Sequence, residues 1–150
     1  MGGGTNLERL QKGHGTVKPK VLIVDDNVLV RETTRIYLES KFPALEVNEA
    51  IDGNDAFNQI RRHLPDLILM DIRLPGENGL KLTRRIKELY PQIVVVIFTS
   101  YDLPEYRKAA FENGAALFFS KSSLHNRKLM GAIDAILADY EFNMDLDESE

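Results

Sequence analysis

Four short apolar runs in this chain each end abruptly in polar residues that are able to take part in chemistry. The runs span 21–24 before Asp25 and Asp26, 67–70 before Asp71, 93–98 before Thr99 and Ser100, and 115–119 before Ser120 and Lys121. Short runs rich in β-branched residues, separated by helical patterns, are typical of buried strands in a parallel sheet. The carboxyl ends of such strands lie at one edge, where open α/β folds bind ligands. The sequence therefore predicts one polar site at that edge.

Helical periodicity separates these runs and sets the order of the elements. Residues on one face of a helix recur every three or four positions. Four sets follow this rule: Leu29, Thr33 and Ile36; Phe57, Ile60 and Leu64; Leu82, Ile86 and Leu89; and Leu129, Ile133, Ile136 and Tyr140. Residues 45–50 alternate with a period of about two, which favours a more exposed strand at a sheet edge. Right-handed crossovers place helices on both faces. The predicted fold class is α/β, a flavodoxin-like, doubly wound (βα)5 domain with a five-stranded parallel sheet in the order 2-1-3-4-5.

Single residues mark the ends of several predicted helices. Asp52 is expected to cap the helix that follows it, because its carboxylate can accept an N–H of the first turn. Gly114 is expected to end the fourth helix, where a left-handed backbone conformation is favoured. Pro65 and Pro91 precede the third and fourth strands and are expected to end the helices before them.

The composition is that of one globular domain with short extensions. The chain has 150 residues, of which 43% are hydrophobic and 28% charged, enough for a single core. We expect a flexible N-terminal arm over residues 1–18, a folded domain over 19–140 and an acidic C-terminal tail over 141–150. Two interpretations of the tail stay open, a solvated helix end and an acidic docking segment for a partner.

Charge and residue content exclude several classes of protein. The net charge of -4 argues against a surface that binds nucleic acid. The absence of cysteine excludes disulfides and thiolate metal sites and fits a reducing compartment. No apolar stretch approaches the roughly 20 residues of a membrane span. We therefore expect a cytoplasmic protein without a membrane or nucleic-acid partner.

Three carboxylates form the centre of the predicted site. Asp25 and Asp26 follow the first strand and Asp71 follows the third, and these strands are neighbours in the proposed order. Two like charges about 4 Å apart repel by roughly 4 kcal/mol at an effective dielectric constant near 20. Either a carboxyl group takes up a proton or a cation relieves the repulsion, and carboxylate oxygens suit Mg²⁺. The alternative is that the three acids serve only as helix caps and loop residues.

Lys121 and Thr99 add a cation and a hydroxyl group at the same edge. Lys121 would supply positive charge and hydrogen-bond donors to an anion, and Thr99 could donate its hydroxyl to a phosphoryl oxygen. The alternatives are a surface lysine with an extended side chain and a threonine that caps the fourth helix. The convergence of both residues with the three acids favours a site that handles phosphate together with a cation.

The order of these residues resembles that of a known family. The matching pieces are 21–26, 69–76, Gly79, 98–100 and 118–121. Together they resemble the receiver domain of two-component response regulators, as in the single-domain receivers of chemotaxis, over about residues 19–140. The resemblance implies a bacterial signalling phosphoprotein rather than an enzyme with a separate substrate. Such a domain catalyses only its own phosphorylation and slow dephosphorylation.

The resemblance implies a phosphoacceptor and a metal site. Asp71 would accept a phosphoryl group from a phosphohistidine on a histidine kinase or a histidine phosphotransfer protein. Asp26 and Asp71, with the backbone carbonyl of Arg73, would ligate Mg²⁺. Asp25 would act mainly through a water on the metal.

The resemblance also implies a switch. Lys121 would pair with the phosphoryl group, Thr99 would hydrogen-bond to it, and Phe118 would be the aromatic switch residue. The face made by the fourth helix, fifth strand and fifth helix would then contact a downstream effector protein or output domain. A phosphorylation-dependent homodimer is also left open. Arg73 and Tyr101 would flank the phosphate, and we expect these two large side chains to shield the acyl phosphate from water.

Two positions depart from the pattern of the family. Phe118 lacks the hydroxyl that a tyrosine would bring, so its inward state gains burial without a phenolic hydrogen bond. Ser122 stands where the family often has a proline after a cis peptide bond. A cis bond before a residue other than proline costs roughly 2.5–4 kcal/mol, which leaves the conformation of the Lys121–Ser122 peptide open.

Other functions fit the sequence less well. A haloacid-dehalogenase-type phosphatase needs a second acid two residues after its nucleophile, where this chain has Arg73. A flavodoxin needs a Ser-, Thr- and Gly-rich phosphate loop after the first strand, where this chain has Asp25, Asp26 and Asn27. A receiver that binds partners without phosphorylation stays open, although the intact site argues against it. The basic clusters at 61–63 and 84–85 are interpreted as solvated helix faces. Both a stand-alone receiver and the receiver of a longer protein remain open.

Overall fold

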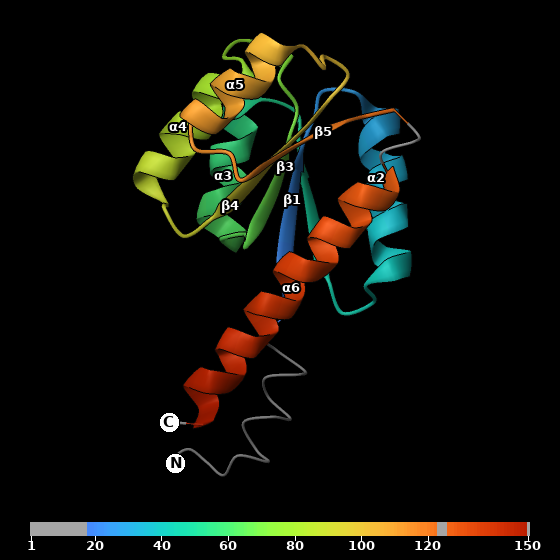
Figure 1. Ribbon diagram of the computed structural model, residues 1–150, viewed down its shortest axis with the longest axis vertical. Helices are drawn as coiled ribbons and strands as arrows, with labels where there is room; N and C mark the ends of the chain where they lie inside the picture. Colours follow the sequence, from blue (N-terminus) through green and yellow to red (C-terminus); the bar gives the residue numbers. More distant parts are fainter. Residues whose placement is uncertain (1–17, 123–125, 150) are drawn as a thin grey trace.

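The predicted parallel sheet is present, in the order β2-β1-β3-β4-β5 (Figure 1). The structure, a computed structural model, describes residues 18–122 and 126–149. The strands are β1 (Lys20–Val24), β2 (Glu46–Ala50), β3 (Leu67–Met70), β4 (Val94–Thr99) and β5 (Leu117–Ser120). The helices are α2 (Val28–Lys41), α3 (Gly53–His63), α4 (Gly79–Leu89), α5 (Pro104–Glu112) and α6 (Asn126–Ser149). The flavodoxin-like α/β fold and the edge position of β2 are confirmed.

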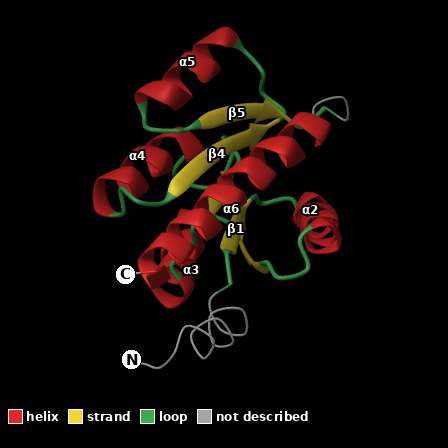
Figure 2. Cartoon of the chain, turned by 60° about the horizontal axis from the view of Figure 1, so that its bottom comes forward, coloured by secondary structure: helices red, strands yellow, loops and turns green. Residues whose placement is uncertain are grey.

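Different helices cover the two faces of the sheet, because successive side chains of a strand point to opposite sides. Leu22 and Val24 belong to a core shared with α3, α4 and α5. Val21 and Ile23 belong to a second core shared with α2 and α6, and α6 crosses in front of the strands in Figure 2. Since β1 is covered on both faces, its run is almost wholly apolar, as expected for a central parallel strand.

The hydrogen bonds between neighbouring strands continue up to the predicted site. Val24 is aligned with Met70 at the ends of β1 and β3. The backbone N–H of Asp71 then donates to the carbonyl of Val24 at 3.0 Å, and that of Lys121 donates to the carbonyl of Thr99 at 2.8 Å. The first residues after these strands are therefore held by the sheet itself.

The predicted helix signals are confirmed. Asp52 caps α3 by accepting the backbone N–H of Asp55 at 2.8 Å. Gly114 follows α5 with a φ of +102°, a conformation that residues with a Cβ rarely adopt. The helices α3 and α4 end before Pro65 and Pro91, respectively.

The periodic residues that predict α2 are not the residues that this helix buries. Leu29 and Ile36 are 69% and 65% exposed, whereas Thr34 and Leu38 are buried. The predicted stripe through Leu29, Thr33 and Ile36 and the buried stripe through Thr34 and Leu38 both have helical spacing. Only contact with the sheet decides which stripe is buried, so the periodicity that correctly predicts helix α2 does not identify its inward face.

The ends of two other predicted stripes are also exposed. Leu64 is the C-cap residue of α3 and is 48% exposed, and Leu89 is the last residue of α4 and is 64% exposed. Both lie where their helix leaves the sheet, while Ile60 and Ile86, one turn earlier, are fully buried. Helical spacing therefore identifies these faces correctly but not where their burial ends.

The two ends of the chain are described to different extents. The helix α6 continues to Ser149, so most of the expected acidic tail over residues 141–150 is helical. The predicted arm is outside the described residues apart from Lys18, as is the side chain of Tyr140. Among the described residues, no helix is both long and apolar enough to cross a membrane.

Candidate functional site

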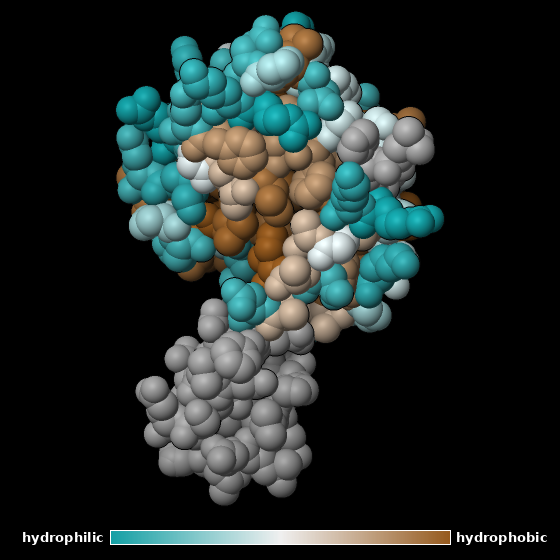
Figure 3. Space-filling view, in the orientation of Figure 1, coloured by the Kyte–Doolittle hydropathy of each residue, from teal (hydrophilic) through white to brown (hydrophobic). Residues whose placement is uncertain are grey.

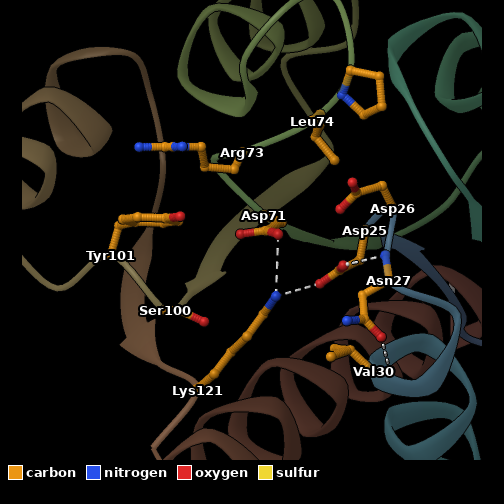
Figure 4. Close-up of a pocket in the computed structure, with 11 residues that line it drawn as sticks. Asp25, Asp26, Asn27, Val30, Asp71, Arg73, Leu74, Ser100, Tyr101 and Lys121 are labelled. Atoms are coloured by element: carbon orange, nitrogen blue, oxygen red, sulfur yellow. Dashed lines mark hydrogen bonds and ion pairs between the residues drawn. The ribbon is translucent and has the colours of Figure 1, made fainter.

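The carboxyl ends of β1, β3 and β5 bring Asp25, Asp71 and Lys121 together (Figure 4). The Nζ atom of Lys121 lies 2.5 Å from Asp25 Oδ2 and 3.1 Å from Asp71 Oδ2. The lysine therefore bridges two carboxylates that are only 2% and 6% exposed. Buried charges are costly unless they are paired. Lys121 offsets part of the repulsion that the sequence predicts between the acids.

Asp26 completes a cluster of three carboxylates. One oxygen atom from each of Asp25, Asp26 and Asp71 lies within 4.8 Å of the other two. Asp26 is exposed while its neighbours are buried, so the cluster opens to solvent on one side. Three carboxylates against one ammonium leave two negative charges, and carboxylate oxygens are the ligands that Mg²⁺ prefers. The donor set therefore fits one magnesium ion.

Hydrogen bonds to the backbone fix the orientation of the buried acids. Asp25 Oδ1 accepts the N–H of Asn27 at 2.9 Å, and Asp71 Oδ1 accepts the N–H of Ile72 at 2.8 Å. Each bond leaves the second oxygen free to face Lys121. Asn27 also caps α2 by accepting the N–H groups of its first turn. Sequence analysis did not identify this cap, although an asparagine directly before a helical pattern is a signal for one.

Burial raises the pKa of Asp71 above the ordinary value of an aspartate. Lys121 opposes this rise, the charge of Asp25 adds to it, and a hydrogen bond from Thr99 lowers the pKa again. Thr99 is fully buried, and its hydroxyl oxygen also accepts the N–H of Tyr101 at 3.3 Å. The threonine predicted to bind a phosphoryl group therefore lies near the acid proposed to carry it.

A cavity of about 520 Å³ opens above the cluster. Its lining includes the three acids together with Arg73, Tyr101 and Lys121, three other residues named in the sequence analysis (Figure 4). Ser100 and Asn27 also line it, and neither was among the predicted site residues. The two predicted switch residues, Thr99 and Phe118, are buried and lie outside the lining.

A stack of side chains bounds one side of this cavity. The guanidinium carbon of Arg73 lies 4.4 Å from the centre of the Tyr101 ring, a cation–π contact. The ring of Tyr101 in turn meets that of Tyr106 edge to face, with the ring centres 6.4 Å apart. The stack joins the loop after β3 to the loop after β4 and extends to α5.

A second cation–π contact covers Phe118 on β5. The guanidinium carbon of Arg107 lies 4.6 Å from the centre of the Phe118 ring, and Arg107 donates a hydrogen bond to Asp102 at 2.9 Å. The ring is 5% exposed. The Lys121–Ser122 peptide is trans, since no cis bond occurs within the described ranges. Ser122 therefore follows an ordinary trans peptide bond.

The basic residues of α4 have local partners. Arg84 pairs with Glu88 one turn along the helix. Arg85 pairs with Glu77 and also lies over the ring of Phe57, 4.7 Å from its centre. These contacts support the interpretation of this basic cluster as a helix surface rather than a nucleic-acid interface.

Comparison with known proteins identifies the family. The sequence model of the response regulator receiver domain matches residues 21–134. Transcriptional activator protein ExaE of Pseudomonas putida is 35% identical over 103 residues, which are 69% of this chain and 48% of that protein. A LuxR-family two-component response regulator from Aurantimonas sp. SI85-9A1 has a TM-score of 0.74 and 36% identity, covering 81% of this chain and 86% of that one. A CheY-like receiver domain protein from Methanospirillum hungatei JF-1 has a TM-score of 0.75 and 26% identity, covering 84% and 98%.

The similarity covers the part of the chain that carries the site. The matched residues run from within β1 into α6, so they include all the predicted site residues from Asp25 to Lys121. The chain spans about half the length of the curated relatives that it matches. On sequence, strand order and the clustering of the acids with Lys121, this chain belongs to the response regulator receiver domain family of two-component signalling.

Proposed function

We propose that this receiver domain accepts a phosphoryl group on Asp71 with the help of bound Mg²⁺. The observation that carries the proposal is the position of Lys121, which bridges Asp25 and Asp71 below an open cavity. An ammonium group in that place can meet the oxygens of a phosphoryl group on Asp71.

The transfer exchanges one bond to phosphorus for another. A carboxylate oxygen of Asp71 forms a bond to phosphorus, while the bond from phosphorus to the imidazole nitrogen of the donor phosphohistidine breaks. The electron pair of the broken bond stays on the imidazole, which takes up a proton from solvent. Lys121 stabilises the negative charge of the phosphoryl oxygens, and the backbone bond from Ile72 holds the acceptor carboxylate in place.

The acidic cluster gives the metal its place. Asp26 and Asp71, with the backbone carbonyl of Arg73 and a more distant contribution from Asp25, would hold Mg²⁺. When bound, the ion would neutralise negative charge on the phosphoryl oxygens. The two uncompensated negative charges of the cluster are the physical reason to expect it there.

Incubation with acetyl phosphate tests this function directly. With Mg²⁺ present, intact mass spectrometry is expected to show the addition of one phosphoryl group, because acetyl phosphate supplies a reactive phosphoryl group without a protein donor. Chelation of Mg²⁺ by EDTA is expected to prevent the addition. A protein whose mass stays unchanged with Mg²⁺ would contradict the proposal and point to a receiver that only binds partners.

The partners follow from the same chemistry. The donor would be a histidine kinase or a histidine phosphotransfer protein in the cytoplasm. The signal would pass to a downstream effector protein or to an output domain. Formation of a homodimer would likewise depend on phosphorylation. ExaE is named as a transcriptional activator protein. Control of transcription through an output domain is therefore one output that we propose for this chain.

The Arg73–Tyr101 stack is proposed to slow loss of the phosphoryl group. The two side chains line the cavity and contact each other at 4.4 Å, so they restrict the approach of water to an acyl phosphate on Asp71. Arg73→Asn and Tyr101→Ala are each expected to shorten the half-life of the phosphorylated protein several-fold. The decay can be followed by mass spectrometry after acetyl phosphate is removed. Unchanged decay in both variants would exclude shielding.

The switch is proposed to run through Thr99 and Phe118 to the face made by α5, β5 and α6. New phosphoryl oxygens would attract the Thr99 hydroxyl, and the Phe118 ring would adjust to the space behind it. Apolar side chains gather over the sheet edge between α5 and α6 (Figure 3), where Leu117 and Phe119 are only partly buried. Inverting a population from 1:99 to 99:1 takes about 5.5 kcal/mol, so a useful shift needs a strong new contact such as one to phosphate.

Amide chemical shifts measured by NMR test the switch. Addition of beryllofluoride and Mg²⁺, a mimic of the phosphorylated state, is expected to shift the amide signals of Phe118 and of residues around Tyr106. The amides at the start of β2, at the opposite edge of the sheet, serve as an internal control and should move little. If Phe118 and its neighbours kept their shifts while the signals near Asp71 moved, phosphate binding would be separate from this face.

A further inference from the structure

A partly buried arginine holds the backbone of the acidic cluster from behind. Arg31 lies in the first turns of α2, and its side chain is only 12% exposed. Its Nη1 donates to the backbone carbonyl of Asp25 at 2.7 Å, and its Nε donates to Glu49 Oε1 at 2.9 Å. The planar guanidinium therefore uses two of its fixed directions, one toward the loop after β1 and one toward β2.

Glu49 is held by a second arginine that does not reach the cluster. The Nε of Arg35 lies 2.6 Å from Glu49 Oε2 but without hydrogen-bond geometry, and its side chain is 38% exposed. Arg31 and Arg35 therefore share one carboxylate and carry the same charge. Only Arg31 also binds the backbone of the acid pair.

Hydrogen bonds hold the backbone of Asp25 on both sides of its Cα atom, and the one from Arg31 is made to the peptide that joins the two acids. The N–H of Asp25 donates to the carbonyl of Ala50 at 3.0 Å, and the carbonyl of Asp25 accepts from Arg31. Within the described residues, the carboxylate of Asp26 accepts no hydrogen bond, so its position depends on the backbone that carries it. Figure 4 shows Asp25, Asp26 and Asn27 in succession where the chain enters α2.

We propose that Arg31, oriented by Glu49, is a positioning residue for the carboxylates that bind the cation. The inference rests on the proposed magnesium site and adds a residue that contacts no ligand itself. Groups that orient metal ligands through hydrogen bonds commonly change metal affinity about 10- to 100-fold when they are removed. The fixed Asp25–Asp26 peptide gives Arg31 that role here.

Charge and positioning predict opposite effects for this arginine. Loss of a positive charge near three carboxylates would by itself strengthen the binding of a cation. Loss of the bond to the Asp25 carbonyl would loosen Asp26 and thereby weaken the binding of the cation. The direction of the change in Mg²⁺ affinity therefore separates the two explanations.

Calorimetric titration of the whole chain with Mg²⁺ at constant ionic strength tests the proposal. Arg31→Gln is expected to raise the dissociation constant for Mg²⁺ about tenfold. Arg35→Gln removes the same charge from the same glutamate without touching Asp25, and it is expected to leave the constant within about twofold of the parent value. Circular dichroism at the assay temperature establishes that each variant is folded.

A conservative variant guards against misfolding of Arg31→Gln. Arg31→Lys keeps the charge but has a single ammonium in place of the two-directional fork, and it is expected to weaken Mg²⁺ binding in the same direction. Equal or tighter binding in folded Arg31 variants, or equal weakening in Arg35→Gln, would overturn the proposal while leaving the proposed function intact. A parent chain that binds no Mg²⁺ would overturn both.

Discussion

The Asp71→Asn variant is expected to gain no phosphoryl mass from acetyl phosphate under conditions in which the parent protein gains one group. Asparagine has the same shape, and its amide oxygen can still accept the N–H of Ile72, which Asp71 accepts at 2.8 Å. The amide lacks the negative charge and nucleophilic oxygen of the carboxylate. Because burial raises the pKa of Asp71, a neutral side chain costs less to bury there. The free energy of unfolding is therefore expected to equal or exceed that of the parent, which separates lost chemistry from lost folding.

Asp66 provides a matched control at the other end of the same strand. It directly precedes β3, whereas Asp71 directly follows it. Its carboxylate accepts the N–H of Lys20 at 2.9 Å, and burial raises its pKa as well. Asp66→Asn is expected to be phosphorylated like the parent. Phosphorylation of Asp71→Asn would show that Asp71 is not the acceptor, whereas its loss in Asp66→Asn would show that the effect of Asp71→Asn is not specific to the site.

The sheet and the cluster of acids could be predicted from the sequence because both follow from strand burial. A strand covered on two faces needs an unbroken apolar run, and β1 and β3 have one. The first polar residues after such runs must lie at the same sheet edge. Asp25, Asp71 and Lys121 meet for this reason, and strand order alone sufficed to predict it.

The contacts that depend on packing angles were not predictable in this way. Two stripes of α2 have helical spacing, and the sheet covers the one with Thr34 and Leu38. Arg31 and Glu49 lie 18 residues apart on a helix and a strand, so nothing in their spacing indicates a contact. The Arg73–Tyr101 stack joins two loops whose course depends on the helices that follow them. Such contacts require the relative placement of elements, which periodicity does not contain.

Gly79→Ala is expected to lower the free energy of unfolding by about 3 kcal/mol or more, measured by denaturant titration. A Cβ atom at Gly79 would lie 1.8 Å from the backbone carbonyl oxygen of Asp71 and 2.8 Å from its carbonyl carbon. Both are backbone atoms of the residue that ends the β3 ladder, so no rotamer change can relieve the overlap. The N–H of Gly79 also donates to the carbonyl of Ile72 at 2.8 Å, which holds the start of α4 against this peptide.

Gly131→Ala is the control for the general effect of alanine on a helix. Among the described residues, nothing beyond the adjoining backbone of α6 lies within 4 Å of a Cβ built at Gly131, so alanine there is expected to stabilise the protein by about 0.5–1 kcal/mol. A similar gain in Gly79→Ala would contradict the close approach to Asp71.

Gly79 is required for space rather than for backbone conformation. Among the described glycines, positive φ values occur only at Gly76 and Gly114, so an alanine at Gly79 meets no conformational barrier of its own. The overlap can be relieved only if α4 moves away from the Asp71 peptide, and the loop that carries Arg73 would move with it. Any Gly79→Ala protein that folds at low temperature is therefore expected to be phosphorylated more slowly than the parent. Phosphorylation at the parent rate would mean that the site tolerates this displacement and that the contact serves folding alone.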